Sequence, residues 1–235
     1  MTRRFLTAGA AAVALLAAGC SSTVSGVAEP SGGSGGAAAA ASERIAAPLT
    51  SMLLTPADFP APYQAIVLPE QAIEQAAADL DGIPAGAKVD PAGCKPPAQS
   101  FGPDATAMIV GTDNAARATI SVELTRVDQP LSTREAEIRE CSAVTTTKDG
   151  ATAKVTTTLL PAPPLNADDT MAVRQTVTSG DAAAKVTQSM LRLFGQVHDV
   201  RISATYMTFG DGKPDGAALD QVFTEAVGKV NAAGR

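Results

Sequence analysis

The stretch AKVTQSMLRLFGQVHDVRISATYMT, residues 184–208, contains two runs with the two-residue periodicity of β-strands. The first predicted strand is Ala184–Phe194 and the second is Asp199–Thr208. The connection between them, Gly195-Gln-Val-His-Asp199, has a length that is typical of a β-hairpin. Because strands joined by so short a link pair antiparallel, this stretch predicts an antiparallel sheet.

Further strands with this period occur earlier in the chain. In Ala118–Val127, the side chains of Ile120, Val122 and Leu124 face one way and the polar residues between them face the other. This alternation is typical of a strand with one buried face. The other predicted strands are Tyr63–Leu68, Ala107–Val110, Ala153–Leu160 and Met171–Thr178.

Helical periodicity is clearest near the end of the chain, in Gly216–Val230, where apolar residues recur at intervals of three and four. Capping-box patterns at Thr55–Asp58 and Ser132–Glu135 predict two helix starts. The other predicted helices are Glu43–Leu54, Pro69–Leu80 and Ser132 to about Val144. Together these elements predict a single α+β domain over residues 43–235, with a central antiparallel sheet of about five to six strands packed on one face by helices.

Two of the three cysteines lie in this domain. Cys94 belongs to the Gly- and Pro-rich segment Gly82–Asp104, and Cys141 belongs to the predicted helix that begins at Ser132. In an oxidising compartment they would form one disulfide, closing a loop that stabilises the fold by roughly 4 kcal/mol. The alternative is two free, buried thiols. A zinc site is excluded because it needs four ligands, and the chain has one histidine and no CxxC motif.

The beginning of the chain indicates export. Arg3 and Arg4 precede an uncharged, mostly apolar run, Phe5–Ala18, which is too short to span a bilayer as a helix. This arrangement is typical of a signal peptide, here residues 1–19. The following motif, Leu16-Ala-Ala-Gly-Cys20, resembles the lipobox of bacterial lipoproteins, in which the cysteine carries a diacylglycerol. The alternative is an ordinary secretory signal in which Cys20 is not modified.

Residues 20–42 predict a lipidated Cys20 followed by a flexible linker of Ser, Gly, Ala and Pro. Such a composition has little to bury and cannot offset the entropy of being ordered. Two acyl chains hold a protein durably at a bilayer. We therefore expect a protein anchored in the cell membrane by its lipid, with the domain on the extracytoplasmic or periplasmic side.

Composition excludes some partners. Removal of Arg3 and Arg4 with the signal peptide changes the formal net charge of −6 to −8, which argues against nucleic acid and against docking to anionic head groups. The chain has no tryptophan and few aromatic residues, which disfavours a saccharide-binding surface.

No residue pattern indicates catalysis, a cofactor or a metal. His198 is the single histidine and lies in the predicted hairpin link, without a Gly-x-Ser-x-Gly motif elsewhere. Asp168 and Asp169 are expected in a solvated turn. Asp211 and Asp215 lack the further oxygen ligands of a calcium loop, and we expect them in a turn before the last helix. We therefore expect no catalytic residues, no cofactor and no metal site.

Three motifs carry a family resemblance: Leu53-Leu-Thr-Pro-Ala-Asp-Phe-Pro60, the loop Gly93-Cys-Lys-Pro-Pro97, and the helical Cys141 followed by Thr/Val-rich strands. With the lipobox and linker, they resemble small lipoproteins of mycobacteria and their relatives, including a family defined only as a domain of unknown function. These are similar in turn to the extracellular sensor domain of a mycobacterial receptor Ser/Thr kinase. The resemblance implies an α+β domain with a central antiparallel sheet and a cleft for an unidentified ligand.

Three functions are consistent with these observations. The first is a non-catalytic, sensor-like or ligand-binding module whose ligand is an unidentified small molecule, lipid or protein. The second is a carrier of apolar envelope lipids, which needs a deep apolar cavity. The third and weakest is a hydrolase of envelope polymers, which needs acids or a nucleophile in one cleft.

Overall fold

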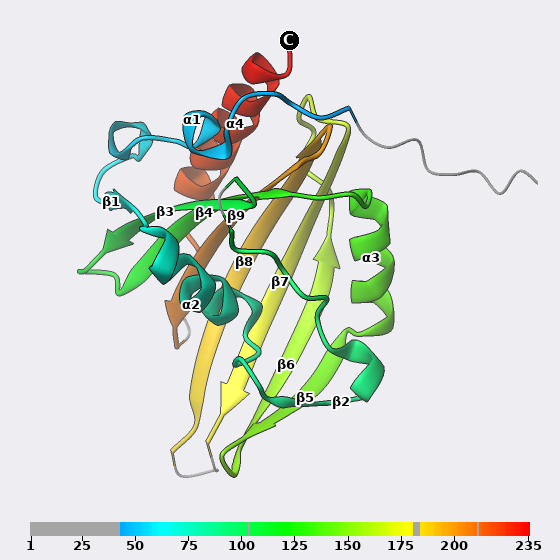
Figure 1. The fold of residues 1–235 in the computed structure, drawn as a ribbon. Coiled ribbons are helices and arrows are strands. Elements are labelled where there is room, and N and C mark those ends of the chain that lie inside the picture. Colours follow the sequence, from blue (N-terminus) through cyan, green and yellow to red (C-terminus); the bar gives the residue numbers. More distant parts are fainter. Residues whose placement is uncertain (1–42, 103, 181–183, 211) are drawn as a thin grey trace, which may run out of the picture. The chain divides into compact units, whose positions relative to one another are not determined.

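The computed structural model describes residues 43–102, 104–180, 184–210 and 212–235. Within these residues, nine strands form one antiparallel sheet in the order β1-β3-β4-β9-β8-β7-β6-β5-β2 (Figure 1). The strands are β1 (Gln64–Val67), β2 (Lys88–Asp90), β3 (Thr106–Asp113), β4 (Ala118–Arg126), β5 (Ala143–Lys148), β6 (Ala151–Leu160), β7 (Asp169–Ser179), β8 (Val186–Val197) and β9 (Val200–Phe209). The predicted signal peptide, Cys20 and linker lie outside the described residues.

The antiparallel sheet and the α+β class are confirmed, whereas the prediction of five to six strands is wrong. The additional strands include β2, which lies within the Gly- and Pro-rich segment, and β5, which begins inside the helix predicted over 132–144. That helix ends at Glu140, and Val144 and Thr146 then alternate as buried residues on β5. Helical and strand periods cannot be told apart over so short a run.

The helices are α1 (Leu49–Met52), α2 (Glu70–Asp81), α3 (Leu131–Glu140) and α4 (Gly216–Ala233). The helix predicted over Glu43–Leu54 is wrong in its first half because Pro48 is tolerated only at a helix start. The predicted cap at Ser132 is also wrong, since α3 begins at Leu131 after Pro130. The capping box at Thr55 is confirmed, and it opens the 3₁₀ turn Pro56–Asp58.

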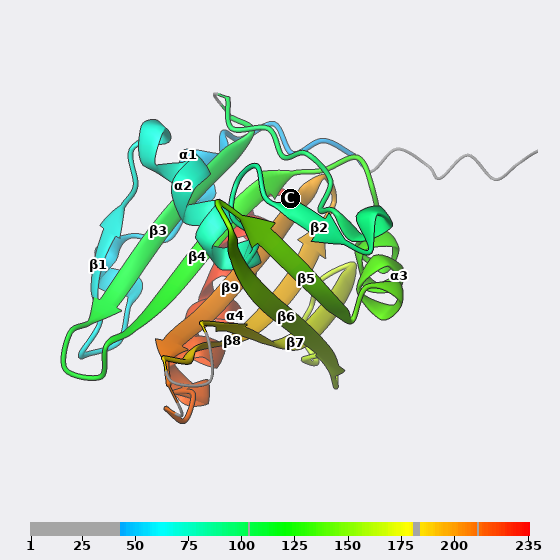
Figure 2. The same ribbon diagram turned by 90° about the horizontal axis from the view of Figure 1, so that it is seen from below.

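Helices cover both faces of the sheet, not one as predicted. Helix α4 packs on β4, β8 and β9, and α1 packs beside it, so we call this side the α4 face. Helices α2 and α3 pack on the opposite side, against β3 and against β6 and β7, and we call this side the disulfide face. Figure 2 looks along the strands and shows α2 lying within the curve of the sheet. The prediction failed because β3 is apolar on both faces, with Ile109 towards α1 and Met108 towards α2.

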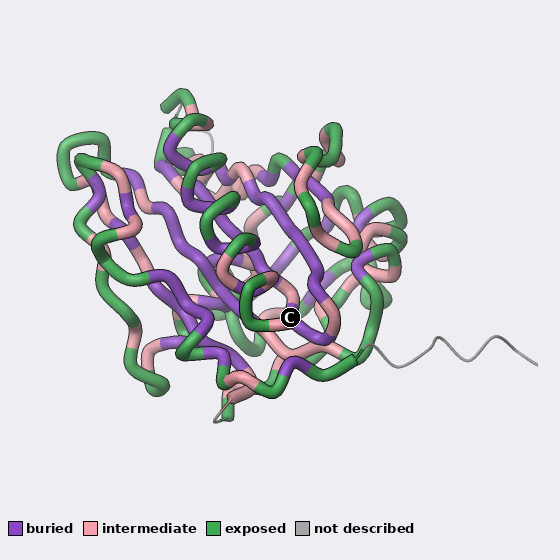
Figure 3. The backbone as a smooth tube through the Cα atoms, turned by 90° about the horizontal axis from the view of Figure 1, so that it is seen from above, coloured by how far each residue is buried: buried purple, intermediate pink, exposed green. Residues whose placement is uncertain are grey.

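The α4 face is the main hydrophobic core. Ile120, Val122 and Leu124 of β4 are fully buried against α4, as their alternation predicted. The matching stripe on α4 includes Leu219 and Phe223, which are likewise fully buried. Figure 3 shows buried backbone along the strands and along the inner side of the helix, and exposed backbone at the turns.

The hairpin between β8 and β9 is tighter than the sequence indicated. Strand β8 continues to Val197, so the turn consists of His198 and Asp199. Gly195 lies within the strand, where an added Cβ would be 3.3 Å from Val227 Cγ2 and 3.4 Å from Phe223 Cζ of α4. This glycine therefore permits close packing of the helix on the strand, a common role of glycine within strands.

The segment before α1 is fastened to the end of this hairpin. Asp199 and Arg126 form a buried ion pair at 2.9 Å. The Asp199 carboxylate also accepts a hydrogen bond from the backbone N–H of Ile45 at 2.8 Å, and Arg126 donates to the carbonyl of Ala47 at 2.7 Å. A charge pair with these additional bonds has its hydrogen-bonding capacity largely used, which is the condition for a buried pair to be tolerated. No helix in the described part of the chain is long and apolar enough to cross a membrane.

Candidate functional site

A cavity of about 210 Å³ lies on the disulfide face between α3, the segment around Cys94 and the strands β5 to β8. We call it the disulfide cavity, and its walls include Cys94, Ile138, Cys141, Gln175, Arg192 and Phe194. Its volume is below the roughly 300–1,000 Å³ of sites for drug-sized ligands, so it suits a compact ligand.

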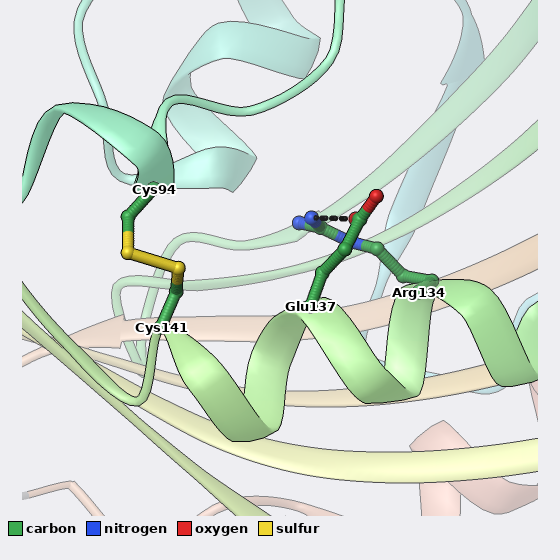
Figure 4. The surroundings of a disulfide bond; sticks show 4 residues. All are labelled: Cys94, Arg134, Glu137 and Cys141. Carbon is green, nitrogen blue, oxygen red and sulfur yellow. Dashed lines mark hydrogen bonds and ion pairs between the residues drawn. A yellow bond between two sulfur atoms is a disulfide. The ribbon is translucent and has the colours of Figure 1, made fainter.

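The disulfide forms the rim of this cavity. Cys94 and Cys141 are joined, with their Cα atoms 5.5 Å apart, so the predicted pairing is confirmed. Cys141 caps the C-terminal end of α3, and Glu137 and Arg134 lie one and two turns before it (Figure 4). All three side chains project from the same side of the helix, because residues at these spacings share a helix face. The bridge therefore holds the Gly- and Pro-rich segment over the side of α3 that lines the cavity.

Arg192 of β8 lies on the floor of the cavity with only 7% of its surface exposed. Its Nη1 donates to Gln175 Oε1 at 3.3 Å and to Asp81 Oδ1 at 3.4 Å. The centre of its guanidinium is 5.0 Å from the centre of the Phe194 ring, a cation–π distance. Burial lowers the pKa of Arg192, and the carboxylate of Asp81 opposes this change. An arginine still remains charged at neutral pH.

The end of α2, Asp81 and Gly82, lies directly against the sheet, and we call these two residues the strap. Gln175 of β7 donates through Nε2 to the backbone carbonyl of Asp81 at 2.7 Å. The next residue, Gly82, ends the helix at φ +66°, and an added Cβ would lie 2.5 Å from Val177 Cγ2. Only glycine combines a left-handed backbone with no Cβ, so this residue allows the strap to lie directly on the sheet.

A buried polar stripe continues from the cavity across the middle of the sheet. It consists of Gln175 (β7), Arg192 (β8), Ser203 and Thr205 (β9) and Glu123 (β4), all at most 7% exposed. Strand pairing places Thr205 directly beside Arg192 and Ser203 directly beside Glu123. Because paired residues point to the same face of a sheet, the whole stripe faces the covering segment and not α4.

Glu123 forms the end of the stripe farthest from the cavity. Its Oε1 accepts hydrogen bonds from Gln99 Nε2 and, at 3.4 Å, from Thr125 Oγ1. Burial raises the pKa of Glu123 above its usual range, and the bond from Gln99 only partly opposes this effect. Gln99 belongs to the segment between the disulfide and β3, so this contact holds that segment over the stripe.

Several polar atoms of the stripe have no hydrogen-bond partner among the described residues. They are Arg192 Nε, Ser203 Oγ and Thr205 Oγ1. Thr119 Oγ1 and Arg201 Nε on the same face are unpartnered too within the described part of the chain. Most buried polar groups in proteins are hydrogen-bonded, to protein or to ordered water. Of these residues only Arg192 lines the disulfide cavity, so an acceptor in the cavity can reach these unpartnered groups only through Arg192.

The other polar residues that the sequence singled out lie elsewhere. The backbone N–H of His198 donates to Asp168 Oδ2 at 2.6 Å, so Asp168 stabilises the tight β8–β9 turn. Asp169 is the first residue of β7, and Asp215 caps α4 by accepting from the Ala218 N–H at 3.1 Å. Asp211 lies outside the described residues. Within the described ranges, no three His, Cys, Asp or Glu side chains are placed to hold a metal ion.

The sequence indicated the disulfide but not the site residues Gln175, Arg192 and Glu123. Arg192 alternates with Leu191 and Leu193, which is the pattern of a polar residue on the solvent side of a strand. Only the strap and the disulfide-linked segment, which cover that side, turn it into an interior. The long irregular segment was the one available signal, because such segments in compact domains are often functional.

A second cavity of about 440 Å³ lies on the same face, towards the opposite ends of the strands. Its walls include Pro84, Lys148, Val177, Met207 and Phe209. Phe209 is half exposed there. The walls thus combine apolar side chains with at least one charge.

No family model matches the chain, and no curated protein matches it either. Among solved structures, one match is the extracellular domain of the kinase PknH from Mycobacterium tuberculosis, at 16% identity and a TM-score of 0.37. It covers 54% of this chain and 64% of that domain, which is less than two thirds of it. Another is an uncharacterised protein from Mycobacterium smegmatis, the Rv0999 ortholog, at 15% identity and a TM-score of 0.40, covering 72% of this chain and 86% of that one. These neighbours agree with the sequence resemblance, and at such low similarity we base no functional conclusion on them.

Proposed function

We propose that this protein is an exported lipoprotein, anchored in the cell membrane through Cys20, whose extracytoplasmic domain binds a small ligand without transforming it. The observation that carries the binding role is the disulfide cavity, whose floor contains a buried arginine with unused hydrogen-bond donors among the described residues. The lipobox-like motif Leu16–Cys20 supports the anchor.

The construction of the cavity supports binding over a purely structural role. A buried guanidinium is expensive unless its donors are satisfied, and here the ion pair with Asp81 uses only one of its nitrogens. The side chain of Asp81 is itself about one third exposed, which weakens the pair further. A core built for stability alone would be served better by an apolar residue at position 192, so the arginine points to recognition.

The non-catalytic part of the proposal rests on the chemistry of the walls. The carboxylates that line the cavity with Arg192 are Asp81, Glu137 and Glu140. Asp81 and Glu137 each pair with an arginine, Arg192 and Arg134 respectively, and so are poorly placed to act as general bases. His198 is held at the hairpin turn and is not part of the cavity wall.

A carrier of apolar lipids remains the second candidate, and the second cavity favours it. Val177, Met207 and Phe209 offer an apolar surface, and the volume of about 440 Å³ is twice that of the disulfide cavity. Lys148 on its wall offers a charge for an anionic head group. The two candidates differ in the ligand that should be found and in the cavity that should hold it.

Mass spectrometry of the protein purified from its native membranes tests the binding role directly. The proposal expects a retained small polar molecule, which is lost when the protein is unfolded and which restores thermal stability when it is added back. Retention of acyl lipids alone would favour the carrier instead. If the purified protein carries no ligand, and extracts of the same membranes do not shift its melting temperature, the binding proposal is wrong.

Replacement of the anchoring residue tests the other half of the proposal. Cys20→Ala should release the domain from the membrane fraction or leave an uncut precursor, and should abolish incorporation of a labelled fatty acid. Ser21→Ala, one residue further on, is the matched control and should stay in the membrane fraction. Normal fractionation and labelling of Cys20→Ala would contradict the anchor.

A further inference from the structure

Arg192 has hydrogen-bond donors for which the described residues provide no acceptor. Only Nη1 is used within the described residues, by Gln175 and Asp81 at 3.3 and 3.4 Å. Nε is sealed from solvent and has no acceptor there, and Nη2 makes no hydrogen bond to a described residue. One edge of a planar guanidinium is therefore without an acceptor in a side chain that is more than nine-tenths buried.

The neighbours of Arg192 on the same face add further donors. Thr205 is its cross-strand partner on β9, and Ser203 is the partner of Phe194, which also lines the cavity. The hydroxyls of both residues are buried and lack partners among the described residues. A hydroxyl can donate as well as accept. These hydroxyls adjoin Arg192 on the sheet without lining the cavity, and Glu123, the nearest acid of the stripe, is biased towards its neutral form by burial, which raises its pKa.

The charged residues on the walls of the disulfide cavity balance one another, so an anionic ligand would be held by Arg192 itself and not by a net positive charge. Three cationic residues line the cavity, Lys95, Arg134 and Arg192, and three acidic residues oppose them, Asp81, Glu137 and Glu140. Arg134 is already bound to Glu137 at 3.0 Å. Since the formal charges cancel, the cavity has no strong net field, and recognition requires the directed donors on its floor.

We infer that the disulfide cavity binds a compact ligand bearing an oxyanion, a carboxylate or a phosphate, which accepts a hydrogen bond from Nη2 of Arg192, the terminal nitrogen that bonds to no described residue. Guanidinium forks match the two oxygens of such groups, and charge-assisted bonds of this kind are among the strongest in proteins. The volume of about 210 Å³ limits the part of the ligand inside to a few non-hydrogen atoms beyond the oxyanion. This inference rests on the proposed binding function and names the chemistry of its ligand.

Titration of the mature, full-length protein in detergent micelles tests the inference. The probes are acetate, butyrate and inorganic phosphate, with acetamide and butyramide as neutral matches. Binding is followed by the NMR signal of the Arg192 Nε–H and by isothermal titration calorimetry. We expect at least one oxyanion to shift this signal in a saturable manner and to bind at least about tenfold more tightly than the amides. Binding of only carboxylates, or only of phosphate, distinguishes the two sources of the oxyanion.

Two substitutions at one position separate charge from geometry. Arg192→Gln and Arg192→Lys should each weaken oxyanion binding at least about tenfold, because the first removes the charge and the second removes the fork. The matched control is Arg201→Gln, since Arg201 also has an Nε without a described partner on this face but does not line the cavity. Its binding should remain within about twofold of that of the wild type. The melting temperature of each variant shows whether it is folded, and the wild-type titration applies even if a variant is not.

The outcomes distinguish this inference from the proposed function. If a ligand from native membranes binds folded Arg192→Gln as tightly as the wild type, or if amides bind as well as oxyanions, the inference is wrong and the binding function stands. If neither the probes nor the native extract bind the wild-type protein, both are wrong.

Discussion

The two faces of the sheet are built on different principles. The α4 face is closed by one long helix whose apolar stripe meets apolar residues of β4, β8 and β9. The disulfide face is covered by two shorter helices, a strap at Asp81–Gly82 and a cross-linked segment, and its middle is polar. Five of the six buried side-chain atoms that lack a partner among the described residues lie on the disulfide face. The comparison shows that one continuous apolar core stabilises the α4 face, whereas the disulfide face combines smaller apolar clusters with a covalent bond, a glycine and polar contacts around a cavity.

The largest expected effect comes from removing the covalent bond of the disulfide face. Replacing both Cys94 and Cys141 by Ser should lower the free energy of unfolding by about 4 kcal/mol, because the bridge closes a loop with a sequence separation of 47 residues in the unfolded chain. This corresponds to roughly 10 °C in Tm. Chemical denaturation and thermal melting measure it. Reduction of the wild type should have the same effect and should leave the double variant unchanged; a reductant-insensitive wild type would contradict the role of the bridge.

On the α4 face, a truncation in the helical stripe should have the next largest effect. Leu219→Ala should lower the free energy of unfolding by about 3 kcal/mol, because Leu219 is fully buried and the helix cannot collapse into the space. Gln221→Ala, on the exposed side of the same helix, should change it by less than about 0.5 kcal/mol. Equal effects of the two substitutions in denaturant titrations would mean that the α4 face is not a packed core.

Two glycines near the strap separate backbone strain from steric contact. Gly82→Ala should destabilise the fold by about 2 kcal/mol, because its φ is +66° and the new Cβ would overlap Val177. Gly86 has a similar φ of +77°, but no atom lies within 4 Å of the position that a Cβ would take, so Gly86→Ala should cost only about 1 kcal/mol. Denaturant titration measures both. A Gly86 variant as unstable as the Gly82 variant would show that contact with the sheet contributes nothing.

The remaining prediction concerns Glu123 on the disulfide face, whose contribution to stability has a characteristic pH dependence. Burial raises its pKa above the ordinary 4.5, so the folded protein keeps a proton that the unfolded chain loses as the pH rises past that value. Stability should therefore fall as pH rises from about 4.5 towards the folded-state pKa and level off above it, with a slope no steeper than about 1.4 kcal/mol per pH unit.

Glu123→Gln isolates this contribution, because glutamine carries no charge at any pH. The difference in unfolding free energy between this variant and the wild type should shift in favour of the variant across the same pH window. Glu225→Gln, on the exposed side of α4, is the control and should show no such trend. A pH-independent difference for Glu123→Gln would show that Glu123 has no raised pKa in the folded protein.

Features that depend on local pattern could be predicted from the order of the residues. The apolar stripe of α4 and the alternation in β4 follow from side-chain spacing, and the antiparallel pairing of β8 with β9 follows from the short link between them. The pairing of Cys94 with Cys141 followed from elimination, because the third cysteine has a separate expected role. These predictions hold because periodicity states which side chains share a face of an element.

Periodicity does not show which segments cover that face. The covering segments come from distant parts of the chain, and only the tertiary structure brings them there. The side of β8 that bears Arg192 reads as solvent-exposed, yet a strap from α2 and a disulfide-linked segment, both distant in sequence, make it an interior. Likewise, Gly195 reads as a turn residue, whereas it permits the approach of α4. In both cases the deciding contact comes from residues far along the chain, so no local pattern could contain it.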